Sequence, residues 1–343
     1  MDTIGLDLHK RESQLCVIDS RGEITEERRI VTARERFTAV FSGRARCRIL
    51  LEASTESEWV ARHLESLGHE VIVADPGFAP MYATRSKKVK TDKRDAWTLA
   101  EACRLGAYRA THRVSAVQRH VRSELLVRDS LVRTRTRYVA LIKAAVRREG
   151  LRLPQGDAER TASKLGAIPL REEVLQELAP ILGLLAALNS EIYSADERIG
   201  QLAKDNPVVR RLMTAPGIGP VTAVSFVAAL DEVTRFGGAH QVESYLGLVP
   251  SEYSSGDRKH RGRITKRGNP RMRSLMDEAG WRILRSRTSE TAHLRAWALL
   301  IAARRGKRIA VVALARRLSG ILYAMWRDGN VYRTPNRKLE AAA

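Results

Sequence analysis

The sequence predicts an α/β region over residues 1–111, followed by a mostly helical remainder. Short apolar runs alternate with amphipathic stretches in the first region, whereas apolar residues recur every three, four or seven positions over 113–150. The charge also divides here: residues 1–111 hold 19 Lys and Arg against 17 Asp and Glu, and the rest hold 41 against 22. We therefore expect two differently built parts.

The order of elements in the first part is typical of a ribonuclease H-like fold. Three runs joined by polar turns predict an antiparallel meander, after which helices and strands alternate. The expected strands cover residues 3–8, 14–19, 22–30, 46–54 and 69–76, and the expected helices cover 34–42, 55–67 and 92–105.

The second part begins with a predicted helical hairpin. Its arms cover residues 113–150 and 171–204, and the Pro- and Gly-containing link LRLPQGDAE joins them. Arg and Lys occupy the other faces of the first arm, so the hairpin could form a coiled coil that dimerises, binds nucleic acid, or does both. A third region starts at residue 207 and is mostly helical over 274–327.

Composition restricts the partners and the location. The formal charge of +21 and the pI of about 10.5 favour polyanions, nucleic acid first and an anionic membrane second. Apolar runs such as residues 309–314 are far shorter than the ~20 residues of a membrane span. Three separated cysteines lack zinc-site spacing and suit a reducing compartment. We expect a soluble, cytoplasmic protein.

Four acidic residues of the first part are candidates for catalysis. Asp7 lies in a strand that should be buried, Glu52 ends another, and Asp92 and Asp95 are three apart at a helix start. Converging carboxylates repel one another, and a divalent metal such as Mg²⁺ resolves that repulsion. Taken singly, three of them have an ordinary explanation: a strand-end acid for Asp7, and a helix N-cap for Asp92 or Asp95.

Gly217 and Gly219 in PGIGPVTA separate two predicted helices, an arrangement like a helix-hairpin-helix. Glycine lets backbone N–H groups approach a phosphate closely, and such a turn would read phosphate and shape rather than sequence. An ordinary turn between two helices explains the same residues.

The stretch PSEYSSGDRKHRGRITKRGNPRMR, residues 250–273, places two serines before a run of positive charge. Serine needs activation to act as a nucleophile, and guanidinium groups can stabilise charge on a phosphoryl group under attack. A flexible phosphate-binding loop explains the composition equally well. The candidates for nucleic-acid contact are Arg258, Lys259, Arg261, Arg263, Lys266, Arg267, Arg271 and Arg273.

Six motifs together resemble the DEDD-type insertion-sequence transposases of family one-ten, which is related to the pilin-inversion invertase. GLDLHK contains Asp7, LLEAS contains Glu52, and KTDKRDA contains Asp92 and Asp95. The blocks PGIGPVTA, YLGLVPSEYSSG and GRITKRGNPRMR follow in the order and spacing of that family's second domain. The resemblance covers nearly the whole chain.

The resemblance implies a RuvC-like catalytic domain over residues 1–111, a helical coiled-coil region over 112–205 and a transposase domain over 206–338. Apart from the resemblance, the terminal residues LEAAA, 339–343, are interpreted as a cloning remnant. The four acids would hold Mg²⁺, or Mn²⁺ in vitro. Ser255 would attack DNA and form a phosphoserine link, with the adjacent Ser254 as the alternative.

The resemblance also implies the partners. Members of the family act on donor and target double-stranded DNA as homo-oligomers, with dimers forming a tetramer in the synaptic complex. A structured non-coding RNA, the bridge RNA, would guide them by pairing with both DNAs, while the protein reads backbone and shape. No membrane partner is expected.

Other functions stay open on the residues alone. A Holliday-junction resolvase or similar Mg²⁺-dependent nuclease would use the carboxylates but needs neither the PGIGP turn nor the serines. A non-enzymatic basic nucleic-acid-binding protein would keep the carboxylates for structure only. An inactive descendant of a transposase is a further alternative, although all five catalytic candidates are present.

Overall fold

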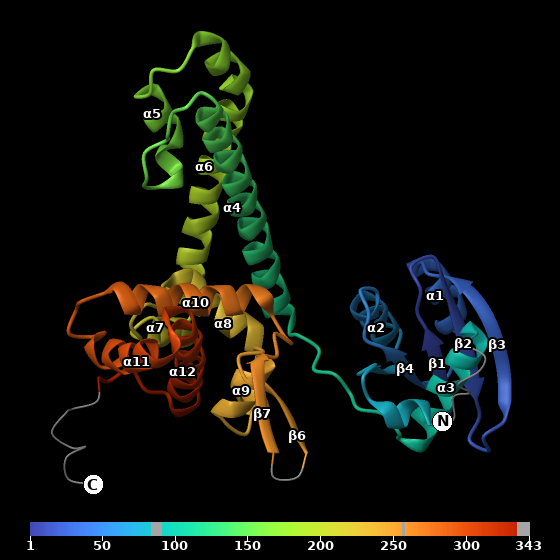
Figure 1. The fold of residues 1–343 in the computed structure, drawn as a ribbon. Coiled ribbons are helices and arrows are strands. Elements are labelled where there is room, and N and C mark those ends of the chain that lie inside the picture. Colours follow the sequence, from blue (N-terminus) through green and yellow to red (C-terminus); the bar gives the residue numbers. More distant parts are fainter. Residues whose placement is uncertain (84–90, 256–257, 335–343) are drawn as a thin grey trace, which may run out of the picture. The chain divides into compact units, whose positions relative to one another are not determined.

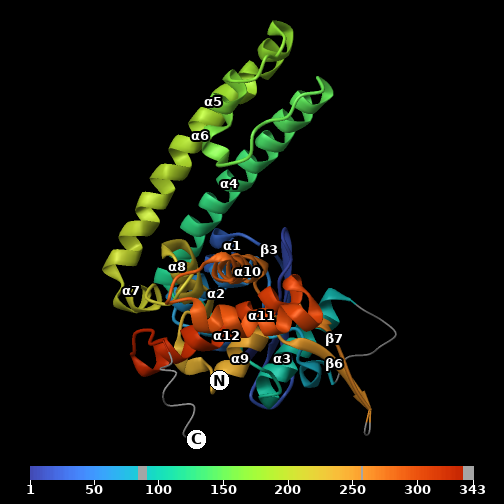
Figure 2. The same cartoon turned by 60° about the vertical axis from the view of Figure 1, so that its left-hand side comes forward.

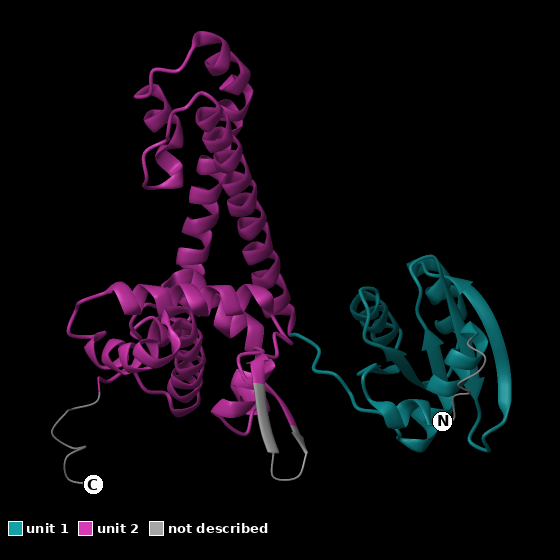
Figure 3. Ribbon diagram, viewed as in Figure 1, with its two compact units in different colours: residues 1–114 teal, residues 115–343 magenta. Residues whose placement is uncertain are grey.

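The computed structural model describes residues 1–83, 91–255 and 258–334, and for 254, 255 and 258–261 it describes the backbone only. The chain divides into two compact units, Met1–Val114 and Ser115–Ala343 (Figure 3). Unit 1 is a mixed α/β sheet structure and unit 2 is mostly helical (Figure 1). The predicted change from α/β to helical structure along the chain is therefore confirmed.

Unit 1 is built on one five-stranded sheet with the order β3-β2-β1-β4-β5. The first three strands form an antiparallel meander, β4 pairs in parallel with β1, and β5 pairs in parallel with β4. The predicted order of strands and helices is confirmed. The strands are β1 (Thr3–Asp7), β2 (Glu12–Ile18), β3 (Ile24–Val31), β4 (Arg48–Glu52) and β5 (Glu70–Ala74).

Helices cover both faces of this sheet. Successive residues of its strands point to opposite faces, and both of these faces are buried. Ile4 and Leu6 of β1 pack in one core with residues of α1 (Arg34–Phe41) and α2 (Ser57–Ser66). Gly5 lies between them and faces the backbone of α3 (Asp92–Leu105) on the opposite side. The same alternation puts Asp7, two residues after Gly5, on the α3 face.

Unit 2 begins with the predicted helical hairpin. Its arms are α4 (Ala116–Arg148) and α6 (Glu172–Asp205), which lie side by side (Figures 1 and 2). Val139, Ile142 and Val146 of α4 share a buried core with Val174 and Leu178 of α6. Two short segments, η2 (Ala158–Arg160) and α5 (Thr161–Gly166), lie between the arms in sequence.

The rest of unit 2 is a helical core around α8 (Pro220–Leu230), whose residues 223–230 are all buried. Phe226 packs there with Leu314, Leu318 and Tyr323 of α12 (Lys307–Asp328). The helices are α7 (Pro207–Leu212), α8 (Pro220–Leu230), α9 (Ala239–Tyr245), α10 (Pro270–Arg285), α11 (Ala292–Arg305) and α12 (Lys307–Asp328), with η3 (Val233–Arg235) before α9.

The basic stretch after residue 250 contains an antiparallel β-hairpin, whereas sequence analysis offered a flexible phosphate-binding loop as one explanation of its composition. β6 (Pro250–Ser255) pairs with β7 (Arg258–Ile264), and Ser255 lies opposite Arg258. The composition, rich in Ser, Lys and Arg, has no alternation of apolar and polar residues to predict strands. The available signal was the Gly-Asp pair at 256–257, a dipeptide that often joins two strands.

Within the described part of the chain, two helices, α6 and α12, are long and apolar enough to cross a membrane by length and composition. The expectation that apolar stretches are too short is wrong for them, because it counted uninterrupted runs only. Half of the most apolar window of α12 is buried inside the structure, against 22% for α6. Core helices of soluble proteins pass the same test, so this finding alone does not favour a membrane.

Candidate active site

Asp7 and Glu52 lie at the ends of neighbouring parallel strands. β1 ends at Asp7 and β4 ends at Glu52, and the register pairs Leu6 with Leu51, the residues just before them. Parallel strands end at the same edge of a sheet, so the two carboxylates emerge together. Both residues are half-buried.

Asp92 and Asp95 lie in the first turn of α3, which packs on the same face of the sheet. The N-cap of α3 is Thr91, whose side chain accepts a hydrogen bond from the Arg94 N–H, so neither acid serves as the N-cap. The helix can approach β1 because Gly5 has no side chain; a Cβ there would lie 2.0 Å from the Ala96 carbonyl oxygen.

The four carboxylates are close enough to repel one another. Burial raises the pKa of Asp7 above its ordinary value of 3.8, and Asp95, Glu52 and Asp92 raise it further, while His9 lowers it. Asp7 Oδ2 is buried and, within the described part of the chain, takes part in no hydrogen bond. The structure thus brings Glu52, Asp92 and Asp95 close to Asp7. The negative charge of the Asp7 carboxylate is not fully compensated by its surroundings.

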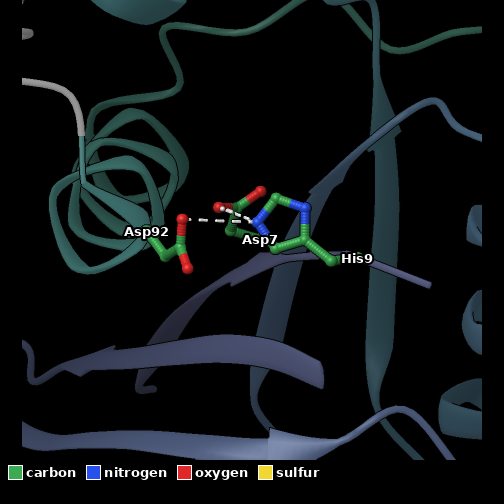
Figure 4. Close-up of side chains that lie close together, drawn as sticks. All are labelled: Asp7, His9 and Asp92. Atoms are coloured by element: carbon green, nitrogen blue, oxygen red, sulfur yellow. Dashed lines mark ion pairs between the residues drawn. The ribbon is translucent and has the colours of Figure 1, made fainter. Parts of the chain in front are cut away.

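Two side chains that sequence analysis missed, those of a histidine and an arginine, lie against these acids. His9 Nε2 lies 3.3 Å from Asp7 Oδ2 and 3.5 Å from Asp92 Oδ1 (Figure 4). Arg29 Nη2 donates to the other oxygen of Asp92, Oδ2, at 3.1 Å. Arg29 reaches it because Asp7, Gln14 and Arg29 lie in one row across three strands.

His9 had a signal in the sequence and Arg29 did not. His9 follows Asp7 by only two residues, directly after the end of β1, and this proximity to a candidate ligand was the signal. The position of Arg29 depends on the register of two strand pairs, which the sequence alone does not specify.

Tyr82 contacts Glu52, the acid at the end of β4. Its hydroxyl donates to Glu52 Oε1 at 2.5 Å, from the short helix η1 (Ala79–Tyr82) that follows β5. This contact fixes the direction of the Glu52 carboxylate, and nothing in the sequence pattern pointed to it.

The acids fit a divalent cation. They offer hard oxygen donors from three rigid elements, and the buried Asp7 oxygen without a hydrogen bond is a group that a cation would satisfy. Asp7, His9 and Asp92 each place one potential ligand atom within 4.8 Å of the others. The residues present are therefore suited to a metal centre.

A hollow of about 390 Å³ lies beside Asp92, between β3 and the start of α3. The positive side chains along it could contact the phosphates of a bound strand. Its lining residues are Gln14, Glu27, Arg28, Arg29, Thr91, Asp92 and Lys93.

The PGIGP turn connects α7 to α8, as predicted for a turn between two helices. Gly217 has a φ of +78°, and a Cβ there would lie 3.1 Å from the Ala279 carbonyl oxygen of α10. Gly219 is the N-cap residue of α8. Close packing against α10 thus explains Gly217, and contact of the turn with phosphate stays a prediction.

The predicted nucleophile lies on the β6–β7 hairpin. Ser255 is the last residue of β6, but its side chain is outside the described part of the structure, so its role stays a prediction. The same holds for the side chains of Ser254, Arg258, Lys259 and Arg261.

The remaining basic candidates divide into two groups. Arg263, Lys266 and Arg267 are exposed. Arg271 instead pairs with the buried Asp129 of α4 at 2.7 Å, and Arg273 Nη1 donates to the Leu246 carbonyl oxygen at 3.1 Å. These last two arginines hold unit 2 together, a role that the charge pattern alone did not reveal.

Comparisons with known proteins match both parts of the chain. A family model described as a transposase, of the DEDD type, matches residues 4–149, and one described as the transposase IS116/IS110/IS902 family matches residues 209–295. The chain is 29% identical to the transposase for insertion sequence element IS1111A of Coxiella burnetii, covering 96% of this chain and 91% of that protein. It is 25% identical to the transposase for insertion sequence element IS1328 of Yersinia enterocolitica, covering 96% and 98%.

The first match contains all four acids, and the second contains Gly217, Gly219 and Ser255. The relatives align along nearly their whole length, so the resemblance is not limited to one domain. The chain belongs to the IS116/IS110/IS902 family of insertion-sequence transposases, and it is a DNA transposase of the DEDD type.

Proposed function

We propose that unit 1 is a RuvC-like nuclease centre in which Asp7, Glu52, Asp92 and Asp95 hold divalent metal, Mg²⁺ in the cell and Mn²⁺ in vitro. The observation that carries this proposal is the convergence of the four carboxylates: the pKa of Asp7 is raised by burial and further by Asp95, Glu52 and Asp92. The sheet order β3-β2-β1-β4-β5 supports the RuvC-like interpretation, since Asp7 and Glu52 lie at the ends of adjacent parallel strands.

The residues of unit 1 have separate roles in this proposal. Bound metal ions would polarise the scissile phosphate and offset the charge on the leaving oxygen. Two strand ends and the first turn of α3 fix the carboxylates, so that little reorganisation is needed. Arg28 and Lys93, which line the hollow beside Asp92, would bind phosphates of the strand that enters the site.

Ser255 is the proposed nucleophile, with Ser254 as the alternative. Its Oγ would bond to phosphorus, and the displaced deoxyribose oxygen would leave with a proton. A hydroxyl of the exchanged strand would then attack the phosphoserine, which restores a phosphodiester and releases the serine. Support comes from the family block around Ser255 and from its place at the end of β6, opposite Arg258.

The partners in this proposal follow from charge and from the family. Residues 112–343 hold 41 Lys and Arg against 22 Asp and Glu, which suits donor and target double-stranded DNA together with a structured bridge RNA. The coiled-coil region, 112–205, would join copies into dimers and a synaptic tetramer, and 206–338 would be the transposase domain. The site of action would be the cytoplasm, without a membrane partner.

A trapping experiment tests the chemistry. The full chain is incubated with Mg²⁺, a transcript of its flanking DNA and labelled donor and target duplexes, then denatured and examined for DNA bound covalently to protein. Asp7→Asn, Ser255→Ala and Ser254→Ala are run in parallel. We expect an adduct that is lost in Asp7→Asn and Ser255→Ala and kept in Ser254→Ala.

Each other outcome removes a defined part of the proposal. Cleaved DNA without an adduct, still dependent on Asp7, would favour a hydrolytic nuclease of the Holliday-junction resolvase type. Adduct formation without the transcript would exclude RNA guidance. Nucleic-acid binding with no cleavage in any condition would favour a non-enzymatic binding protein.

A further inference from the structure

His9 stands among the carboxylates with the geometry of a ligand. Its Nε2 faces Asp7 Oδ2 at 3.3 Å and Asp92 Oδ1 at 3.5 Å, and Figure 4 shows the imidazole edge directed at both. Each of the three residues offers one ligand atom, and these three ligand atoms lie within 4.8 Å of one another. One point in space is therefore accessible to a nitrogen and two oxygens at once.

These separations match those between ligands of one ion. Two donors about 2.1 Å from a common ion are about 3.0 Å apart at a right angle and about 3.4 Å apart at the tetrahedral angle. The observed distances of 3.3 and 3.5 Å lie close to this range. An ion could enter with small side-chain movements, because the His9 side chain is 53% exposed and can adjust.

The surrounding contacts leave the required oxygens available to an ion. Arg29 holds Oδ2 of Asp92, so Oδ1 is the oxygen turned toward His9. Asp7 Oδ2, the other oxygen beside His9, takes part in no hydrogen bond within the described residues. Arg29 thus offsets the charge of Asp92 through Oδ2. His9 faces the other oxygen, Oδ1, which stays available to an ion.

We propose that His9 is a direct ligand of the divalent ion bound by Asp7 and Asp92, which adds one nitrogen donor to the acidic set. The inference rests on the metal centre of the proposed function. Imidazole suits transition metals better than it suits Mg²⁺, which prefers oxygen. His9 should therefore strengthen binding of Mn²⁺ more than binding of Mg²⁺.

The alternative role for His9 is that of a cation that pairs with the two acids and leaves when the metal arrives. Both roles fit the distances, but only a ligand brings a ring nitrogen into direct contact with the ion. Pulsed electron paramagnetic resonance on Mn²⁺ detects such a nitrogen through its ¹⁴N modulation, and this readout requires no catalysis.

The experiment uses the full chain with Mn²⁺ added below stoichiometry, together with calorimetric titrations of Mn²⁺ and Mg²⁺. The test variants are His9→Ala and His9→Asn, the second of which keeps a polar side chain. His120→Ala is the matched control, because His120 is also exposed and lies beside a carboxylate, Glu124. Asp7→Asn reports whether the ion occupies the acidic site.

We expect ¹⁴N modulation in the wild type and in His120→Ala, and its loss in both His9 variants. Mn²⁺ affinity in His9→Ala should fall at least about tenfold, since losing even an outer-shell partner of a ligand weakens binding 10–100-fold. Mg²⁺ affinity should fall less.

Mn²⁺ that binds in an Asp7-dependent manner without ¹⁴N modulation would overturn the role of His9 and leave the carboxylate centre standing. That result needs no variant of His9, so a folding defect cannot imitate it. Mn²⁺ binding that is unchanged in Asp7→Asn would overturn the carboxylate centre itself, and the role of His9 with it.

Discussion

Gly5 is the residue that lets α3 carry its two acids to the end of β1. A Cβ at this position would lie 2.0 Å from the carbonyl oxygen of Ala96 and 2.3 Å from the backbone nitrogen of Ala100. Both atoms belong to the helix backbone, so a side-chain rotation cannot relieve the overlap. Gly5→Ala must therefore displace α3 from β1.

The size of the displacement follows from the contact distances. Restoring an ordinary separation of at least 3.4 Å from the Ala96 oxygen moves the helix by about 1.4 Å. Overpacking of this kind destabilises a fold by about 1–3 kcal/mol. Asp92 and Asp95 move with the helix, and a misplacement of about 1 Å can lower a rate about 100-fold.

Urea unfolding and Mg²⁺-dependent DNA cleavage of Gly5→Ala would measure the two effects. Gly43→Ala is the matched control, because a Cβ at Gly43 has no described atom within 4 Å and the backbone there is ordinary for any residue. The control should keep its cleavage rate and unfold with equal or slightly greater stability. Wild-type stability and cleavage in Gly5→Ala would refute the argument that α3 is positioned by this contact.

Three further predictions address separate contacts. Tyr82→Phe removes the hydroxyl that fixes Glu52, so metal affinity measured by titration should fall about tenfold or more, while the melting temperature changes little. Arg271→Ala leaves the buried Asp129 with Arg133 as its remaining described partner, so urea unfolding should show a loss of about 1–3 kcal/mol; unchanged stability with weaker DNA binding would instead support a nucleic-acid contact. Arg263→Ala should flatten the slope of log affinity for DNA against log salt by about 0.9 if it contacts one phosphate, and an unchanged slope would exclude that contact.

The sequence predicted the fold of unit 1 well because burial on both faces produces local signals. Apolar runs marked the strands, and the acids were visible as interruptions or ends of those runs, as with Asp7 and Glu52. The convergence of Asp92 with Asp7 could also be anticipated, since it needed only the order of strands and the helical spacing of two acids.

What the sequence did not predict depends on register and on tertiary contacts. Arg29 reaches Asp92 only because it shares a row with Gln14 and Asp7, and a shift of one residue would turn it to the opposite face. Arg271 belongs to a basic run, yet its partner Asp129 is 142 positions earlier in the chain. A charge pattern shows how many cations a segment has, but not which of them are already paired.

The raised pKa of Asp7 makes the metal-free site a source of instability, and Asp7→Asn tests this. Since the pKa is raised in the folded state, the native protein holds the proton more tightly than the unfolded chain does. The stabilising contribution of protonated Asp7 is complete below its ordinary value of 3.8, and it is lost as the pH rises through the folded pKa.

At neutral pH without metal, Asp7→Asn should therefore melt at a higher temperature than the wild type, and the difference should shrink in acid. Mg²⁺ should raise the melting temperature of the wild type, because it binds only the folded chain, and should leave the variant unchanged. Melting curves between about pH 3 and pH 8, with and without Mg²⁺, check both statements. A lower stability of Asp7→Asn at neutral pH without metal would contradict this prediction. The contact of Asp7 with His9 would then stabilise the fold by more than burial and repulsion destabilise it, and Asp7 would have a structural role in the metal-free protein.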